Sequence, residues 1–258
     1  MGFWQLMIKK DDWICAVVNS IIKIKSLFRL KDGRLLGQQR RQPPLGLGND
    51  VFIILNGPSL KKQNLMLLKG KTLMFVNRGF KHELYRQLSP KYHVFIDPKM
   101  LSGEWPVTWI DEIVEMVPGI TIIMPVTWAS IPQFKPYIDK GITFHWLPIP
   151  PPCTCLGVAG SCIEFAIEQK FEQIFFTGFD ANGIGYELID SASHFYGTNE
   201  ENLKKTTKNY VTDLFMFSRH LHDLNRLAVS CKKRNIKIFN FTEGGLLDMF
   251  TRKTLDEL

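Results

Sequence analysis

Residues 51–59, Val-Phe-Ile-Ile-Leu-Asn-Gly-Pro-Ser, decide the fold of this chain. A short apolar run rich in β-branched residues ends abruptly at Asn56 and Gly57, which is the pattern of a strand buried on both faces that stops at a turn. The same pattern returns at residues 173–180, Gln-Ile-Phe-Phe-Thr-Gly-Phe-Asp. Strands that are apolar on both faces are typical of parallel sheets covered by helices.

Further runs of the same character occur along the chain, with helix-forming stretches between several of them. The other strand candidates are residues 72–77, 93–97, 120–124, 142–147 and 237–241. Helices are expected at residues 158–169 and, as one long helix or two shorter ones, within residues 201–234. This alternation predicts a single Rossmann-like α/β domain, with a mostly parallel sheet and helices on both faces.

The composition excludes several classes of protein. Hydrophobic residues make up 45% of the 258 residues and charged residues 22%, which excludes a disordered, collagen-like or low-complexity chain. No apolar run is long enough for a conventional membrane span. The five cysteines are an odd number at irregular spacing, which argues against a disulfide scaffold and for a reducing compartment.

The net charge of +7 is concentrated at the N-terminus. Residues 1–41 hold nine lysines and arginines against three aspartates, whereas the rest of the chain holds 23 basic and 22 acidic residues. A nucleic-acid-binding body normally carries a basic stripe of its own. The nearly neutral body therefore excludes nucleic acid as the expected partner.

The basic segment has the pattern of an amphipathic helix. Ile14, Val17, Val18 and Ile21 recur at three- and four-residue spacing and share one face, with lysines interspersed further on. Such a helix lies in the headgroup plane of an anionic membrane, or docks on the body or on a second protomer. Because two aspartates precede the apolar run, a signal peptide is not expected. The expected location is the cytoplasm, peripheral to the inner membrane.

The sequence divides into three segments. Residues 1–41 are the basic amphipathic arm, residues 42–50 a flexible linker rich in glycine and proline, and residues 51–258 the Rossmann-like domain. An assembly of like subunits through the arm stays open as an alternative.

Polar residues and a glycine follow the predicted strands, at the edge where α/β sheets bind ligands. These residues are Asn56, Gly57, Ser59, Asn77, Asp97 and Asp180. Glycine lets backbone amides approach a ligand, serine caps a helix facing an anion, and side-chain amides suit a base, ribose or phosphate. Each residue type also forms turns for purely conformational reasons. Two roles are expected for Asp97, which either orders the Asp-Pro turn or contacts the ligand. Asp180 is expected to support the loop that follows it.

A second candidate element opens the helix expected at residues 158–169. Gly157, Gly160 and Ser161 either bring amides to a phosphate or permit close packing of the helix on the sheet. The chain contains neither a Walker A motif nor the Gly-x-Gly-x-x-Gly fingerprint after its first strand. The spacing of its histidines and cysteines fits no zinc site, so no metal is expected.

Four elements of the sequence together resemble a known family. They are Leu55–Leu60 (LNGPSL), Asn77, the block Gly157–Asp180 and Ser193–Gly197 (SHFYG). In this order they resemble the bacterial sialyltransferases of glycosyltransferase family 42, over about residues 51–241. A broader group of sialyltransferase-like proteins shares the Asn-Gly-Pro-Ser start and the Asp-Pro after the third strand.

The resemblance implies a transfer of a sugar from a CMP-activated donor of sialic acid or Kdo type to the hydroxyl of a growing surface glycan. It implies inversion without a metal and without a cofactor. The nucleotide contacts would fall on Asn56, Gly57, Ser59 and Asn77, with Gly157 to Ser161 near the ribose or sugar.

The resemblance also implies the catalytic groups. His194 would be the general base, in a lid over residues 181–199, and Tyr186 would hold the departing phosphate. Ala181 stands where the family has a second tyrosine, which leaves Tyr196 as the candidate substitute. A histidine with a pKa near neutrality accepts the proton of an attacking hydroxyl, and hydroxyl donors stabilise the leaving phosphate.

Three other functions stay open at this point. The first is the same fold acting on another nucleotide sugar. The second is a pterin pyrophosphokinase, which would need ATP and a divalent cation. The third is a non-catalytic nucleotide-binding scaffold in which the arm is the functional part.

Overall fold

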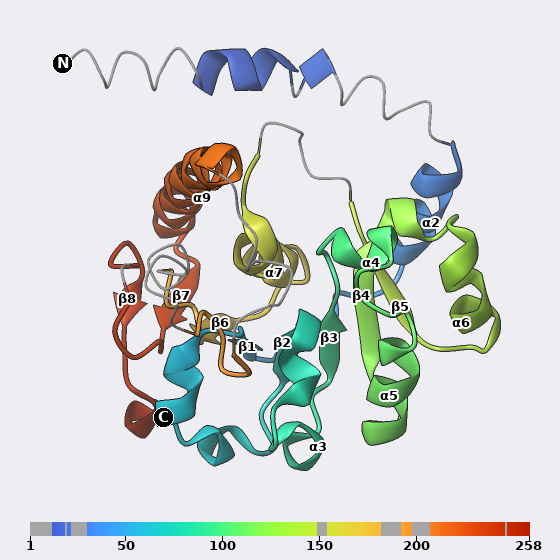
Figure 1. The fold of residues 1–258 in the computed structure, drawn as a ribbon, viewed down its shortest axis with the longest axis horizontal. Helices are drawn as coiled ribbons and strands as arrows, with labels where there is room; N and C mark the ends of the chain where they lie inside the picture. Colours follow the sequence, from blue (N-terminus) through green and yellow to red (C-terminus); the bar gives the residue numbers. More distant parts are fainter. Residues whose placement is uncertain are drawn as a thin grey trace.

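The computed structural model contains one open sheet of eight strands (Figure 1). It describes residues 12–18, 20–21, 30–148, 154–181, 192–197, 207–245 and 247–258. The strand order is β5-β4-β3-β2-β1-β6-β7-β8, and every neighbouring pair of these strands is parallel. The predicted α/β class is confirmed.

The elements follow the predicted alternation closely. The strands are β1 Val51–Ile54, β2 Leu73–Val76, β3 Tyr92–Val94, β4 Thr121–Pro125, β5 Phe144–Leu147, β6 Gln173–Thr177, β7 Lys237–Asn240 and β8 Thr251–Arg252. The helices are α2 Leu30–Arg40, α3 Tyr85–Leu88, α4 Lys99–Ser102, α5 Trp109–Met116, α6 Lys135–Asp139, α7 Gly157–Glu168 and α9 Thr207–Lys233. Short 3₁₀ turns join several of them, among them Pro58–Lys62 after β1.

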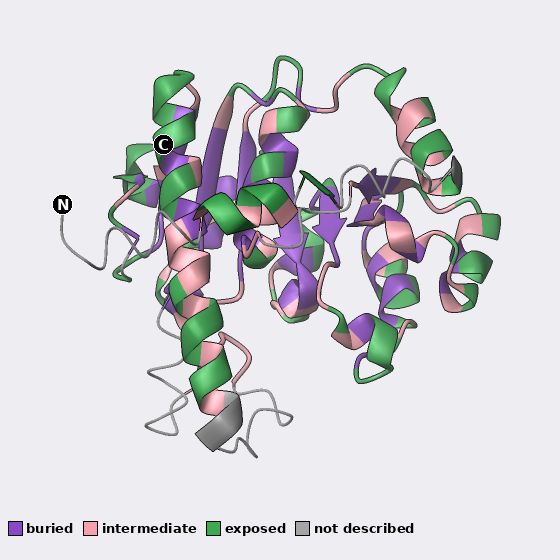
Figure 2. Cartoon of the chain, turned by 90° about the horizontal axis from the view of Figure 1, so that it is seen from above, coloured by how far each residue is buried: buried purple, intermediate pink, exposed green. Residues whose placement is uncertain are grey.

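The central strands are buried on both faces, as their sequences predict. Phe52 and Ile54 of β1 pack into the core on one side of the sheet, whereas Val51 and Ile53 pack into the core on the other. This separation follows from the two-residue period of a strand. Helix α5 covers the first side, and α7 and α9 cover the second (Figure 1). The strands form the buried centre of the molecule (Figure 2).

Helix α2 and the segment after it belong to the body. The Gln39 side chain accepts from the Trp146 N–H at 2.7 Å and donates to the Trp146 carbonyl at 2.9 Å, which holds α2 against the outer edge of β5. Residues 42–50 are also attached, because the Gly46 N–H donates to the Gln169 carbonyl at 2.9 Å. The segment expected as a flexible linker is therefore bonded to the end of α7, and part of the expected arm packs on the sheet.

The first part of the arm is helical at residues 12–18 and 20–21. Residues 19 and 22–29 of the expected amphipathic stretch lie outside the described residues. Within the described ranges, no helix combines the length and apolar composition needed to cross a membrane.

Candidate active site

The candidate site lies at the carboxyl edge of the sheet, where the strand order reverses. The chain passes from β1 to β2 on one side and later returns to place β6 on the other side of β1. In open α/β sheets the ligand crevice lies at this switch point. The loops after β1 and β6 are the ones in which the sequence places Asn56, Gly57, Ser59 and Asp180.

The loops after β1 and β6 are bonded to each other. The Gly57 N–H donates to the Gly178 carbonyl at 2.7 Å. The Ser59 hydroxyl donates to one Asp180 oxygen at 2.9 Å, and the Ser59 N–H donates to the other at 3.2 Å. Burial raises the pKa of Asp180 against the opposing effect of the Ser59 hydrogen bonds. The structure thus brings Ser59 and Asp180 together, with both donors of Ser59 engaged by the carboxylate.

Glycines permit this close approach. A Cβ at position 57 would lie 1.8 Å from an Asp180 carboxylate oxygen. A Cβ at position 178 would lie 2.6 Å from the Leu55 carbonyl, and Gly178 has a φ of +70°, in the left-handed region that side chains rarely adopt. Gly57 therefore serves the contact between the two loops; the approach to a ligand, which the sequence suggested, stays a prediction.

The two asparagines at the strand ends lie side by side at this edge. The Asn56 side-chain amide donates to the Val76 carbonyl at 3.2 Å, which ties the end of β1 to the end of β2. Asn77 has a φ of +47° and is 7% exposed. Within the described residues its side-chain oxygen is buried and has no hydrogen-bond partner. A buried acceptor without a partner costs about 1–3 kcal/mol, so a donor from a ligand at this position would be stabilising.

Two buried side chains, His93 and Tyr85, hold the backbone of Asn77 in place. His93 Nε2 lies 2.9 Å from the Asn77 carbonyl, and Nδ1 lies 2.9 Å from the Tyr85 hydroxyl. Because a carbonyl only accepts, Nε2 carries the proton and Nδ1 accepts from the hydroxyl. Burial lowers the pKa of His93 to about 3, so the ring is neutral at physiological pH.

We expect His93 to make the protein acid-sensitive. Between a pH of about 6.5 and a pH of about 4, the unfolded chain binds a proton at residue 93 that the folded protein excludes. This group alone then lowers the free energy of unfolding by about 1.4 kcal/mol for each unit by which the pH is lowered. His93→Gln keeps a donor for the Asn77 carbonyl and removes this dependence. Urea unfolding of both proteins across this pH range measures the two slopes; equal slopes would contradict the assignment.

Asp97 forms a turn at the end of β3. Its side chain accepts from the Lys99 N–H at 3.0 Å, and its carbonyl accepts from the Met100 N–H at 3.2 Å. The carboxylate therefore orders the Asp-Pro turn that opens α4, which is one of the two roles expected for it.

The glycine-rich start of α7 packs against α9. A Cβ at Gly157 would lie 2.9 Å from the His220 ring, and one at Gly160 would lie 3.2 Å from Leu224. The Ser161 hydroxyl donates to the Gly157 carbonyl at 2.8 Å. These contacts favour close helix packing, the second of the two roles that the sequence left open for these residues.

His194 lies on a short segment attached to the site. In residues 192–197 the Phe195 N–H donates to the Asn56 carbonyl at 2.9 Å, so this segment is joined to the carboxyl end of β1. The backbones of His194 and Gly197 exchange two hydrogen bonds of 3.1 Å each. The His194 ring stacks on the Tyr196 ring at a centroid distance of 4.9 Å. The structure therefore brings His194 and Tyr196 to the loop that carries Asn56; Tyr186 lies outside the described residues.

An aromatic group that sequence reasoning missed surrounds Arg78 at the end of β2. The guanidinium lies 5.3 Å from the Trp105 ring, 5.4 Å from the Trp109 ring and 5.7 Å from the Tyr196 ring. Lys81 and Lys99 lie over the same two tryptophans, at 5.3 Å from Trp109 and 5.6 Å from Trp105. The four-residue spacing of the two tryptophans, which follow the third strand after helix α4, was the available signal.

This group gathers positive charge next to the segment that bears His194. Cations over aromatic faces are held in place without losing their charge. A planar guanidinium matches carboxylate and phosphate groups in two parallel hydrogen bonds. The edge of the sheet thus presents a neutral amide region at Asn56 and Asn77, a cationic region at Arg78, and an imidazole at His194. That combination suits a ligand with a polar base and an anionic group.

A second imidazole lies beside the same segment. The His82 ring is 5.1 Å from the Phe195 ring, and burial lowers its pKa. His82 Nδ1 accepts from the Leu84 N–H at 3.2 Å, which leaves the proton on Nε2. His82 is therefore arranged as a donor, whereas the His194 ring is stacked beside Tyr196.

The fold and the site define an open parallel α/β protein with a ligand-binding edge at its switch point. No known family model matches the chain, and no curated protein matches it. Among solved structures, the chain is similar to the sialyltransferase CstII from Campylobacter jejuni, described in complex with a substrate analogue, cytidine-5'-monophosphate. The identity is 16%, over 80% of this chain and 84% of that chain, with a TM-score of 0.49.

Proposed function

We propose that the protein is a glycosyltransferase that moves a sugar from a CMP-activated donor, of sialic acid or Kdo type, to a glycan hydroxyl. The observation that carries the proposal is the attachment of the His194 segment to the carboxyl end of β1, through the Phe195 N–H and the Asn56 carbonyl. This attachment joins the segment that bears the His194 imidazole to the end of β1, where Asn56 lies. The resemblance of the same residues to glycosyltransferase family 42 supports the choice of donor.

In this proposal each group has a defined task. Asn56 and Asn77 bind the nucleotide through their side-chain amides, and Arg78 binds the donor carboxylate. His194 takes the proton of the acceptor hydroxyl as its oxygen attacks the anomeric carbon. The bond from that carbon to the phosphate oxygen breaks, and CMP leaves with the electron pair. Tyr186 and Tyr196 donate hydrogen bonds to the phosphate, so the chemistry needs no metal.

The proposed setting is the synthesis of a bacterial surface polysaccharide at the cytoplasmic side of the inner membrane. The basic N-terminal segment supports this setting through its charge. An assembly of like subunits stays a prediction.

Thermal-shift titration tests the nucleotide. We expect CMP to raise the melting temperature without magnesium, and UDP, GDP and ATP to raise it less. A tight nucleotide present at about 100 times its Kd stabilises the folded state by about 2.7 kcal/mol, which is a shift easily measured. The Asn77→Ala variant, which lacks the buried side-chain oxygen, is expected to lose most of the shift.

Other outcomes of the titration would overturn the proposal. A shift by UDP or GDP alone would indicate another nucleotide sugar. A requirement for ATP with magnesium would indicate the pyrophosphokinase. The absence of any nucleotide effect would indicate a non-catalytic scaffold.

A further inference from the structure

Helix α9 carries an exposed apolar patch at its N-terminal end. Val211 is 59% exposed, Leu214 42% and Phe215 67%. Their three- and four-residue spacing places them on neighbouring positions of one helix face. We call these three residues the α9 patch. They are separate from Leu224, Ala228 and Cys231, which pack the other half of the helix into the core.

The α9 patch lies beyond the carboxyl edge of the sheet. The helix has 27 residues and leads into β7, which has four. A helix of this length measures about 40 Å and such a strand about 13 Å. Since a helix that connects parallel strands runs antiparallel to them, its first half extends past the edge that carries the candidate site. Figure 2 shows this half of α9 projecting from the body with exposed and intermediate residues.

The helical residues of the N-terminal segment carry a second exposed apolar patch. Trp13 is 69% exposed, Ile14 44%, Val17 40% and Ile21 50%. Their spacing again places them along one face of a helix. We call these four residues the arm patch. Four large apolar side chains on a surface helix exceed what a solvated helix needs.

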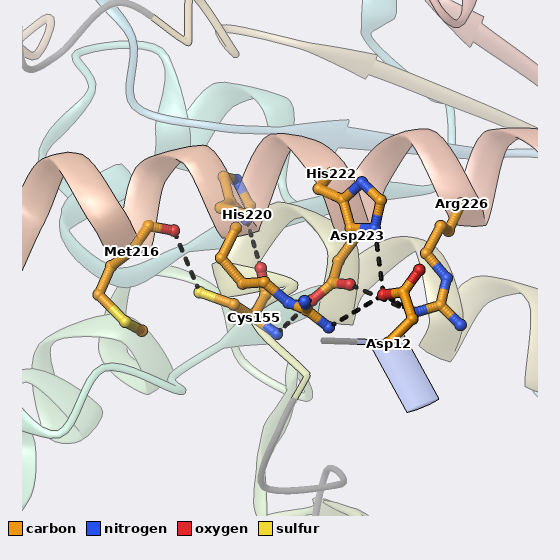
Figure 3. Close-up of polar contacts among 8 residues, drawn as sticks. Asp12, Cys155, Met216, His220, His222, Asp223 and Arg226 are labelled. Atoms are coloured by element: carbon orange, nitrogen blue, oxygen red, sulfur yellow. Dashed lines mark hydrogen bonds and ion pairs between the residues drawn. The ribbon is translucent and has the colours of Figure 1, made fainter. Parts of the chain in front are cut away.

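An ionic cluster joins the two helices. Asp12, directly before the arm patch, lies 3.2 Å from His222 Nε2, 3.2 Å from an Arg226 nitrogen and 3.6 Å from an Arg219 nitrogen (Figure 3). His222 follows Phe215 by seven residues, which is about 10 Å along the helix axis. The arm patch and the α9 patch therefore extend from the same cluster.

We propose that the arm patch and the α9 patch together form one surface that binds an anionic lipid membrane. The choice of a membrane follows from charge. Residues 1–29, which precede α2, carry five basic and two acidic residues, so anionic headgroups complement this segment. A second copy of the chain would bring two such segments together. Exposed Trp, Phe and aliphatic side chains beside basic residues suit the boundary between headgroups and acyl chains.

The position of the surface adds a consequence for the site. The α9 patch extends past the carboxyl edge of the sheet, so binding brings this edge close to the bilayer. A ligand that reaches the site would then be one carried on or close to the membrane. This inference deepens the membrane setting proposed above and does not depend on the sugar-transfer activity.

Vesicle co-sedimentation with the full chain tests the surface. The vesicles are phosphatidylcholine alone, and equal parts of phosphatidylcholine and phosphatidylglycerol. We expect binding to the second kind only, weakened by added salt. Trp13→Glu and Phe215→Glu are each expected to weaken it at least about tenfold, because each loses a buried aromatic side chain. Val229→Glu is the matched control, since Val229 is 47% exposed near the opposite end of α9, and it is expected to bind like the wild type.

Each other outcome overturns the proposal. Wild-type binding by Phe215→Glu would show that the arm alone binds the membrane. Equal loss in Val229→Glu would show an effect of charge without a specific surface. If no variant changes vesicle binding and Phe215→Glu converts a dimer to a monomer in analytical ultracentrifugation, the surface is an interface between copies. Circular dichroism of each variant verifies that α9 is folded.

Discussion

His194→Ala is expected to lower kcat for sugar transfer by between about 100-fold and 10,000-fold, with CMP affinity nearly unchanged. The physical reason is the loss of the group that takes the proton of the attacking hydroxyl. The backbone attachment of the segment, from the Phe195 N–H to the Asn56 carbonyl, does not depend on the His194 side chain. The measurement is steady-state turnover of a CMP-sugar, with CMP binding by calorimetry as the second readout.

His82→Gln is the matched control for this prediction. His82 lies against Phe195 but accepts a backbone N–H through Nδ1, so its replacement by glutamine is expected to change kcat only several-fold. A pH profile adds a further check, because the wild type should lose activity as the base becomes protonated. A large loss in His82→Gln with near-normal turnover in His194→Ala would contradict the assignment of the base.

Gly178→Ala is expected to lower the free energy of unfolding by about 2 to 5 kcal/mol. The left-handed backbone at residue 178 costs about 1–2 kcal/mol for alanine, and the overlap with the Leu55 carbonyl costs about 1–3 kcal/mol more. The loops after β1 and β6 then separate, so CMP-induced stabilisation should fall as well. Urea unfolding gives the free energy, and thermal shift gives the ligand effect.

Gly141→Ala separates the two contributions. Gly141 has a φ of +78°, and a Cβ there meets nothing within 4 Å. The Gly141→Ala variant should lose only about 1–2 kcal/mol of its free energy of unfolding, which is the cost of the left-handed backbone conformation. Gly57→Ala gives the converse case, since residue 57 has a φ of −63° and its added Cβ only overlaps the Asp180 carboxylate and the Gly178 carbonyl. If all three variants lost the same free energy, the close contact of the two loops would not be the cause.

The strands were predictable because their sequences carry the signal directly. Short apolar runs, typical of strands buried on both faces, predicted seven strands near their observed positions. The eighth strand, Thr251–Arg252, has two exposed residues and no apolar run, so only its pairing with β7 defines it. Helix α2 contains two glycines and many polar residues, and contacts distant in sequence hold it in place.

The site was predictable where it follows strand ends and not where it depends on distant contacts. Asn56 and Asn77 follow β1 and β2, so the topology places them together. The bond between Ser59 and Asp180 joins residues 121 positions apart, and no local pattern encodes it. Large aromatic side chains such as Trp105 and Trp109 are usually buried in the core. Their second role, around Arg78, depends on the packing of α5 and of the segment before it.

The contact of Gln39 with Trp146 has a consequence for truncated forms of the protein. The Gln39 side-chain amide bonds to the backbone N–H and carbonyl that β5, as an edge strand, would otherwise present to a ninth strand. Edge strands with unpaired backbone groups recruit other chains and promote aggregation. A soluble version that lacks the basic N-terminus should therefore begin no later than Leu30, so that α2 continues to shield this edge strand.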